Sequence, residues 1–284
     1  IEPYLSSAIV ATAALAATPA SAQRTELLGR LAGGDVVAVL TDETDDELAS
    51  VTAERLSAGW RLSGRKPLVY HASLADLLLV PAQCEGQTAL FAVPVTAAGV
   101  HREAFTTLDD QQAAHVRLDS VELDQSSLLA SDASSALASA QALGLACLCA
   151  DAVGSLDRAL AATIEYSKSR QQFGTAIGRF QSLQHRMADM FMQREQALSM
   201  CYLAASAVSE PDAATRQRSL SAAKIRIGEA ARQIAQQALQ IHGGMGMTDE
   251  LDISHHFRRL TAFELRFGDQ AAHLRRYLEL GQSD

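Results

Sequence analysis

The stretch that decides the fold reads YSKSRQQFGTAIGRFQ and covers residues 166–181. It joins an Ala- and Leu-rich run to a segment whose apolar residues recur on one helical face. We therefore predict a helix that ends at Gly174, a tight turn, and a new helix that begins at Gln181. An arginine and several amides gather at this corner, and a guanidinium with free backbone amides can hold an anion. A capped helix hairpin explains the same residues without a ligand.

A second glycine-rich stretch, QIHGGMGMT at residues 240–248, closes another helical run. That run opens at Asp212, and its apolar residues recur every three or four positions. Gly243 and Gly244 allow positive φ and a close approach of the backbone, so they could cradle a nucleotide or simply cap the helix. His242 alone is more often a packed or solvent-facing histidine than a catalyst.

Outward from these stretches, the chain separates into three regions, which predict an α+β fold that is mainly α. Residues 1–34 are helical and stop at Gly33 and Gly34. Residues 35–124 carry short apolar or alternating runs, typical of a small antiparallel β domain, with Gly64 at a tight turn. Residues 125–284 predict a C-terminal four-helix bundle.

Composition narrows the functional classes. The chain has 284 residues, 48% of them hydrophobic and 20% charged, with a net charge of -9. An acidic chain repels phosphates, so we expect no nucleic-acid partner. The four cysteines suit buried positions in a reducing compartment, so we expect a cytoplasmic protein without a metal site.

The start of the chain needs its own interpretation. The apolar run from Ser6 to Ala22 is preceded by Glu2 and Pro3 and not by a basic residue, so we predict a helix and not a secretory signal. The chain begins with Ile1, which leads us to expect further residues upstream. No uninterrupted apolar stretch of about 18 residues occurs, so we predict no membrane span.

Taken together, the motifs resemble a known family. Arg-x-x-Phe-Gly, Phe-Gln, Met-Ala-Asp-Met and Gln-Ile-His-Gly-Gly-x-Gly follow one another at residues 170–174, 180–181, 187–190 and 240–246. In this order and at this spacing they resemble the acyl-CoA dehydrogenases. Residues 59–66 are similar to the strand-turn-strand of that family's β domain. The resemblance covers nearly the whole chain and implies a truncated N-terminal helical part.

The resemblance implies a flavin cofactor and an acyl-CoA substrate. In the family, FAD accepts a hydride from the acyl β-carbon while a glutamate removes the α-proton. Electron-transfer flavoprotein is the acceptor that the resemblance implies. The family's corner and glycine loop reach across to the FAD of a neighbouring subunit. Carried over residue by residue, the contacts are Arg170, Gln172, Phe173, Gln181, Gln240, Gly243 and Gly244. Arg170 suits the pyrophosphate, because guanidinium pairs bidentately with phosphate.

The sequence departs from the family at the catalytic base. The commonest position of the base glutamate corresponds to Phe267, and a second family position corresponds to Gly144. Neither residue can accept a proton. Glu264 or Asp269 could substitute only with a shifted backbone, and Asp269 is more simply explained as a helix N-cap.

A second departure lies in the β domain. The family's flavin-stacking tryptophan corresponds to Leu68, and its small hydroxyl residue corresponds to Tyr70. A family loop near the diphosphate carries five carboxylates in this chain, which are electrostatically unfavourable there. These are Asp42, Glu43, Asp45, Asp46 and Glu47. The resemblance thus implies a degraded FAD site within the subunit and intact reach-across elements.

This asymmetry resembles the non-catalytic subunit of actinobacterial heterotetrameric acyl-CoA dehydrogenases of the sterol side-chain type. Such a chain would complete the FAD site of a catalytic partner subunit, and alone it would be inactive. Two alternatives stay open. One is a homotetrameric acyl-CoA dehydrogenase with Glu264 or Asp269 as a displaced base. The other is a structural or binding relic of the fold without a redox role.

Overall fold

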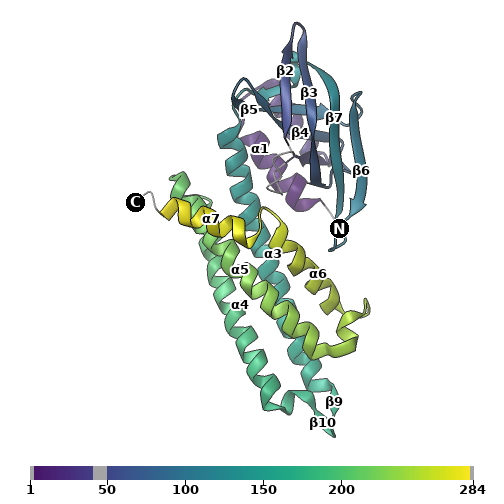
Figure 1. Ribbon diagram of the computed structural model, residues 1–284, viewed down its shortest axis with the longest axis vertical. Coiled ribbons are helices and arrows are strands. Elements are labelled where there is room, and N and C mark those ends of the chain that lie inside the picture. Colours follow the sequence, from purple (N-terminus) through teal and green to yellow (C-terminus); the bar gives the residue numbers. More distant parts are fainter. Residues whose placement is uncertain (1–2, 41–49, 282–284) are drawn as a thin grey trace. The chain divides into compact units, whose positions relative to one another are not determined.

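A computed structural model describes residues 3–40 and 50–281 of the chain (Figure 1). The chain divides into two compact units, Ile1–Gly144 and Leu145–Asp284. Each unit is described by itself. The domain boundaries expected at residues 34 and 124 fall close to the ends of elements and stay a prediction.

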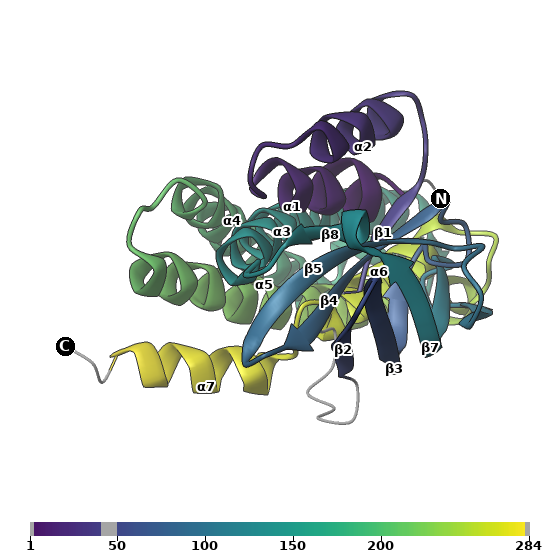
Figure 2. The ribbon, with the colours of Figure 1, turned by 90° about the horizontal axis from the view of Figure 1, so that it is seen from above.

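The first unit opens with short helices that lie on one side of its sheet (Figure 2). These are the π-helix η1 (Tyr4–Ala11), α1 (Thr12–Ala16) and α2 (Ala22–Ala32). The single helix expected from Ser6 to Ala22 is wrong, because the helix ends before Pro19, whose ring disfavours helical geometry in the preceding residue. Ser21 then caps α2 by accepting a hydrogen bond from the Arg24 amide at 3.0 Å. The predicted stop is confirmed, since α2 ends just before Gly33.

The described part of the first unit contains an eight-stranded sheet. Its path runs β6-β7-β3-β2-β4-β5-β8, with β1 beside β4. Most pairs are antiparallel, as expected, but β1 and β2 both pair with β4 in parallel. The strands are β1 (Val37–Val39), β2 (Val51–Leu56), β3 (Gly59–Tyr70), β4 (Leu77–Cys84), β5 (Gln87–Pro94), β6 (Val100–Thr106), β7 (Gln112–Asp124) and β8 (Leu128–Ala130).

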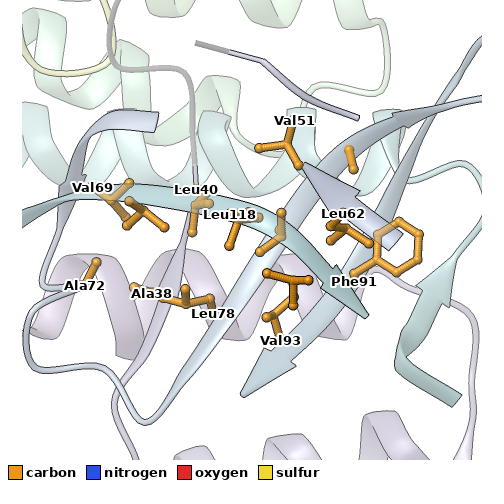
Figure 3. Packing of buried hydrophobic residues seen from close by; sticks show 14 of the residues in the cluster. Ala38, Leu40, Val51, Leu62, Val69, Ala72, Leu78, Phe91, Val93 and Leu118 are labelled. Carbon is orange, nitrogen blue, oxygen red and sulfur yellow. The ribbon is translucent and has the colours of Figure 1, made fainter. Parts of the chain in front are cut away.

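The core of this unit lies against the sheet, where alternate side chains of several strands meet (Figure 3). Leu62, Leu78 and Phe91 are completely buried. Phe91 also meets the ring of Trp60 edge-on, with centroids 5.3 Å apart. Burial of each such side chain contributes about 1.5–3 kcal/mol, which pins the register of the strands.

Gly64 does not form the predicted turn. It lies inside β3 at a bulge opposite β7, with φ of +146°, and a Cβ there would come within 2.2 Å of the Ser50 carbonyl oxygen. The tight turn occurs at residues 57–58, where β2 joins β3. The predicted strand-turn-strand over residues 59–66 is therefore one bulged strand.

The second unit is built from helices, with α3, α4 and α5 side by side (Figure 1). The helical bundle is confirmed, and its last expected helix is interrupted to make two. The helices are α3 (Ser134–Ser169), which begins in the first unit, α4 (Gln181–Ala207), α5 (Ala213–His242), α6 (Asp252–Leu265) and α7 (Gln270–Gly281). The predicted start of α5 at Asp212 is confirmed, and Asp212 caps the helix by accepting a hydrogen bond from the Thr215 amide at 2.7 Å.

One helix, α3, is long and apolar enough to meet the length and composition criteria of a membrane span. Slightly more than half of its most apolar window, 56%, is buried inside the protein. Core helices of globular proteins meet the same criteria, so this is weak evidence for a span.

Candidate functional site

The sequence corner at residues 170–176 folds as a two-residue hairpin and not as the last turn of a helix. Helix α3 ends at Ser169, before the predicted Gly174, and strands β9 (Gln171–Gln172) and β10 (Thr175–Ala176) pair across the turn. Phe173 and Gly174 both have positive φ, 52° and 78°. Two such residues make the type I′ turn that matches the twist of a hairpin. Phenylalanine rarely adopts this conformation, so its place at the tip is a strained feature.

Two aromatic side chains join this hairpin to the glycine-rich stretch. The Tyr166 ring, one turn before the end of α3, stacks on the His242 ring with centroids 4.3 Å apart. Its hydroxyl donates to the His242 carbonyl oxygen at 3.4 Å. His242 is buried, and its Nδ1 donates to the Ala238 carbonyl oxygen at 2.8 Å. The ends of α3 and α5 are thus held together, which confirms a packed role for this histidine.

The glycine-rich stretch forms a 3-10 turn, η4 (Gly243–Met247). Gly243 has φ of +61° and ψ of -142°, a conformation that other residues rarely adopt. Gly246 is required for a different reason. A Cβ at this position would lie 2.9 Å from the His242 Cβ, so only glycine lets the turn close on the end of α5.

We call the seven residues predicted to contact flavin the flavin corner. Each of them is exposed at this end of the second unit, and Phe173 is 92% exposed. The set consists of Arg170, Gln172, Phe173, Gln181, Gln240, Gly243 and Gly244. Residues 166–181 carry three cations and no carboxylate. Within the described residues, the Arg170 guanidinium makes no hydrogen bond or ion pair, whereas Lys168 is paired with Glu165.

We call the loop at residues 265–269 the base loop. In contrast to the exposed flavin corner, it is held by groups from inside the protein. It joins α6 to α7, and Phe267 stands in it with φ of +58° next to Gly268 with φ of +100°. The buried Arg266 places its guanidinium carbon 5.7 Å from the centre of the Phe267 ring. Gly144, at the second position expected for a base, lies inside α3. No proton acceptor therefore occupies either predicted position.

A buried lysine holds the base loop and the end of α6 by hydrogen bonds to their backbone carbonyl oxygens. The Lys224 amine, on the buried face of α5, donates to the carbonyl oxygens of Phe263, Glu264 at 3.3 Å and Arg266 at 2.9 Å. These three acceptors match the three donors of an ammonium group. A cation at these carbonyls also complements the negative end of the α6 dipole.

A buried histidine holds the other side of the base loop. The Phe267 carbonyl accepts a hydrogen bond from His273 Nε2 at 3.1 Å, so His273 Nδ1 accepts from the Ser221 hydroxyl, also at 3.1 Å. Burial, followed by the positive charges of Lys224 and Arg276, lowers the pKa of His273 to about 4. The imidazole is therefore neutral at pH 7 in the tautomer that this loop needs.

The two carboxylates considered as displaced bases are both engaged. A Glu264 carboxylate oxygen lies 2.7 Å from the Arg232 guanidinium. Asp269 accepts a hydrogen bond from the Ala272 amide at 2.7 Å, which is the N-cap that the sequence predicts for α7. Each carboxylate thus has a structural partner, Glu264 in α6 and Asp269 at the start of α7.

These local features agree with a family comparison. Residues 134–279 match the family described as Acyl-CoA dehydrogenase, C-terminal domain. This chain belongs to the acyl-CoA dehydrogenase family. It is 28% identical over 283 residues to Acyl-CoA dehydrogenase FadE27 of Mycobacterium tuberculosis, a match of 96% of this chain and 74% of that protein. Acyl-CoA dehydrogenase IpdE2 of the same organism is 38% identical over 112 residues, which cover 39% of this chain and 33% of IpdE2.

Solved acyl-CoA dehydrogenase structures extend the likeness to both units. A chain of the ChsE4-ChsE5 complex from Mycobacterium tuberculosis matches with a TM-score of 0.86 and 26% identity, covering 99% of this chain and 76% of that one. A chain of a variant of the Tcur3481-Tcur3483 steroid ACAD matches with the same TM-score and 27% identity, over 99% of this chain and 76% of its own. The family membership and the fold inferred from the motifs are confirmed.

The acyl-CoA dehydrogenase comparison leaves the β-domain predictions as they were. Leu68 is half-buried near the end of β3, and Tyr70 is buried with 8% exposure. The replacement of the family's small hydroxyl residue by Tyr70 stays a prediction. The five carboxylates at residues 42–47 lie outside the described residues.

Sequence reasoning missed the residues that hold the base loop. Lys224 follows Leu220 by four positions and precedes Ile227 by three, so it stands on the apolar stripe of α5. A lysine on such a stripe is buried with partners, and this signal could have found it. His273 carried no comparable signal, because its partners Phe267 and Ser221 are known only from the tertiary structure.

Proposed function

We propose that this chain is the non-catalytic subunit of a heteromeric, FAD-dependent acyl-CoA dehydrogenase and completes the flavin site of a catalytic partner. The observation that carries the proposal is the base loop. Phe267 stands at the position that the motif spacing assigns to the family's base, and hydrogen bonds from Lys224 and His273 hold the loop around it. A general base must come within about 3 Å of the proton that it removes, and the side chain of Phe267 cannot accept a proton.

The carboxylates of Glu264 and Asp269 already have partners inside the protein, which also supports a non-catalytic role for this chain. Use of Glu264 as a base would break its ion pair with Arg232, and use of Asp269 would uncap α7. Both changes cost stability before any chemistry begins. The glutamate that removes the α-proton and the acyl-CoA pocket would therefore come from the partner.

The flavin corner fits the diphosphate of FAD. When bound, FAD supplies the redox chemistry by accepting a hydride from the acyl chain. This chain would contribute the Arg170 fork, whose exposed guanidinium can pair bidentately with phosphate oxygens. The strained, exposed Phe173 would pack against the same ligand or its subunit, and Gly243 would let the backbone approach closely.

Partners and setting follow by analogy with the relatives. The matches to the ChsE4-ChsE5 complex and to a steroid ACAD favour a two-subunit assembly, a heterotetramer, that oxidises the acyl-CoA thioester of a sterol side chain or related lipid. Electron-transfer flavoprotein is the proposed electron acceptor, in keeping with the Caffeyl-CoA reductase-Etf complex subunit CarC among the relatives. A cytoplasmic location is proposed for the complex.

Co-expression tests this proposal. We expect the chain alone to be colourless or insoluble, and to become part of a yellow, active complex when it is co-expressed with full-length acyl-CoA dehydrogenase subunits of its organism. A yellow, active homotetramer from this chain alone would replace the proposal with the displaced-base alternative. A colourless product in both cases would favour the binding relic.

Two substitutions separate the subunit's structural role from catalysis. In the active complex, Glu264→Gln and Asp269→Asn are expected to leave turnover near normal, because neither carboxylate removes the α-proton. Loss of turnover in either variant, with FAD content and assembly unchanged, would make this chain catalytic and overturn the proposal.

A further inference from the structure

A cavity of about 660 Å³ lies on the sheet of the first unit, away from the flavin corner and the base loop in the sequence. Its walls come from β3, β6 and β7. The volume lies within the range of small-molecule sites in proteins. The cavity is lined by four lysines and arginines, two histidines and one carboxylate, that of Glu103. In a chain with a net charge of -9, this is a local excess of positive charge.

The strand register arranges part of this lining in a row. Arg65 of β3 pairs with Arg117 of β7, and Arg117 pairs with His101 of β6. Directly paired residues point to the same face of a sheet, about 5 Å apart from strand to strand. The next row on this face contains His115, opposite Glu103. Two guanidinium groups and two imidazoles therefore face one cavity.

The opposite face of the same strands is used differently. Arg102, one residue along β6, donates to the carbonyl oxygens of Ala72 at 2.7 Å and Ala75 at 3.0 Å, which ties down the chain after β3. Lys66 is buried with 6% exposure. These two cations serve the fold, so the cations that a ligand can reach are those of Arg65 and Arg117.

The guanidinium groups of Arg65 and Arg117 can both still bind an anion. The Arg117 guanidinium lies 2.9 Å from an Asp119 carboxylate oxygen, and His101 Nε2 lies 3.2 Å from the same atom, while 61% of the Arg117 side chain is exposed. Arg65 is exposed, and its guanidinium makes no hydrogen bond or ion pair within the described part of the chain. Like charges set side by side repel each other, which an anion between them would relieve.

The same strand supplies a contrast. Arg61 is also exposed on β3, but its guanidinium is bound by Glu54 at 3.1 Å and Glu122 at 3.0 Å on the two neighbouring strands. Arg61 thus has a carboxylate on each side, from β2 and from β7. At Arg65, the cross-strand neighbour on β7 is Arg117.

The geometry points to a binding site for a diphosphate-bearing small molecule in this cavity, held by the Arg65 and Arg117 guanidinium groups. Guanidinium binds phosphate oxygens in pairs, so two forks on adjacent strands suit two linked phosphates. The Nδ1 atom of His115 donates to the Pro67 carbonyl, and the His115 ring lies tilted by 31° against the Phe105 ring, with centroids 4.6 Å apart, at the margin of this row. This aromatic margin can accept a base, so the ligand is either a nucleoside diphosphate or free pyrophosphate.

Titration calorimetry at low salt tests the site, with the full chain in the assembly in which it purifies. We expect saturable binding of pyrophosphate that weakens at least about tenfold in Arg65→Gln and in Arg117→Gln. Arg61→Gln is the matched control and should bind as the wild type does. Arg65→Lys, which keeps the charge without the fork, should bind with intermediate affinity. Thermal unfolding of each variant checks that the sheet is intact.

A second arm separates the sources of the diphosphate. ADP that binds more tightly than pyrophosphate would identify a nucleotide ligand, whereas equal affinity would identify the diphosphate alone. The Arg170→Ala variant tests whether the diphosphate binds at the flavin corner instead. Binding at the proposed site should be unchanged in this variant. The inference is overturned if pyrophosphate gives no saturable binding, if Arg65→Gln and Arg117→Gln bind like Arg61→Gln, or if Arg170→Ala abolishes the binding.

Discussion

The flavin corner and the base loop lie in the same helical unit, yet their polar groups are treated in opposite ways. At the flavin corner, Arg170 is exposed and has no hydrogen-bond or ion-pair partner among the described residues, and Phe173 projects into solvent from a strained turn. At the base loop, Lys224 and His273 bind backbone carbonyls from inside the protein. The first region is left open to a ligand or another chain, whereas the second is closed upon itself.

Whether a polar group has a partner inside the protein distinguishes a binding residue from a structural residue better than the residue type does. A strained or unpaired group persists only where something compensates for it, and at the flavin corner nothing in the described residues does so. A saturated network contributes stability and leaves nothing for a substrate. We therefore expect the base loop to be structural and the flavin corner to be functional.

The largest expected effect comes from Lys224→Met. Removal of the amine leaves three carbonyl oxygens at the end of α6 without their donor, so we expect a loss of about 3 kcal/mol or more in the free energy of unfolding. Urea unfolding of the complex measures it. Lys168→Met, at an exposed ion pair of α3, should cost less than about 0.5 kcal/mol. Equal, small effects in both variants would contradict a fastened base loop.

The next effect is a dependence of stability on pH through His273. Its pKa is about 4 in the folded protein and about 6.5 in an unfolded chain. Between these values the unfolded state binds a proton that the folded state does not, so stability falls as pH falls from about 6.5 to 4, by about 3 kcal/mol in total. Above pH 6.5 this contribution is constant.

Acid unfolding curves of His273→Gln measure that contribution. The variant should lose this part of the slope between pH 6.5 and 4, while His185→Gln, at an exposed position of α4, should keep it. His256 has a pKa lowered by burial, so a residual slope of the same sign is expected in both variants. An unchanged slope in His273→Gln would show that the histidine is not held neutral at the base loop.

Arg170→Ala tests the open region. The complex should lose FAD about tenfold more readily, because a charge-assisted pair with the diphosphate is removed, and the stability of the chain should not change. Flavin absorbance after dialysis measures retention. Lys168→Ala is the matched control, because its ammonium is already paired with Glu165 at 2.5 Å. Equal retention of FAD in both variants would contradict a role of Arg170 in binding FAD.

The smallest effect is expected at the cap of α7. Asp269→Ala should lower stability by about 1 kcal/mol, because the Ala272 amide loses its acceptor, while Asp269→Asn should retain most of the cap. Turnover per intact complex should be normal in both. If the Asp269→Asn variant were stable but inactive, the carboxylate would have a chemical role in addition to capping α7, which would contradict a purely structural base loop.

Much of the fold could be predicted because its signals are local. The apolar period of α5, its Asp212 cap and the glycines at its end each act within a few residues. Predictions failed where the outcome depended on distant contacts. Gly64 was assigned to a turn because of its residue type, but it is needed where the backbone of β3 passes close to Ser50. Similarly, the helix expected to reach Gly174 gives way to a hairpin after Ser169.

By itself, the sequence determined the family and the three types of region, and it predicts that Phe267 replaces the expected base, because motif order and residue identity are properties of the chain alone. Only the tertiary structure decided that Glu264 and Asp269 are engaged, that Lys224 and His273 hold the base loop, and that Arg170 is left open. The physical reason is that partners in hydrogen bonds and ion pairs come from distant segments: Arg232 lies 32 residues from Glu264, and Lys224 lies 42 from Arg266. Residue type states what a group can do, and its neighbours in space decide whether it is free to do it.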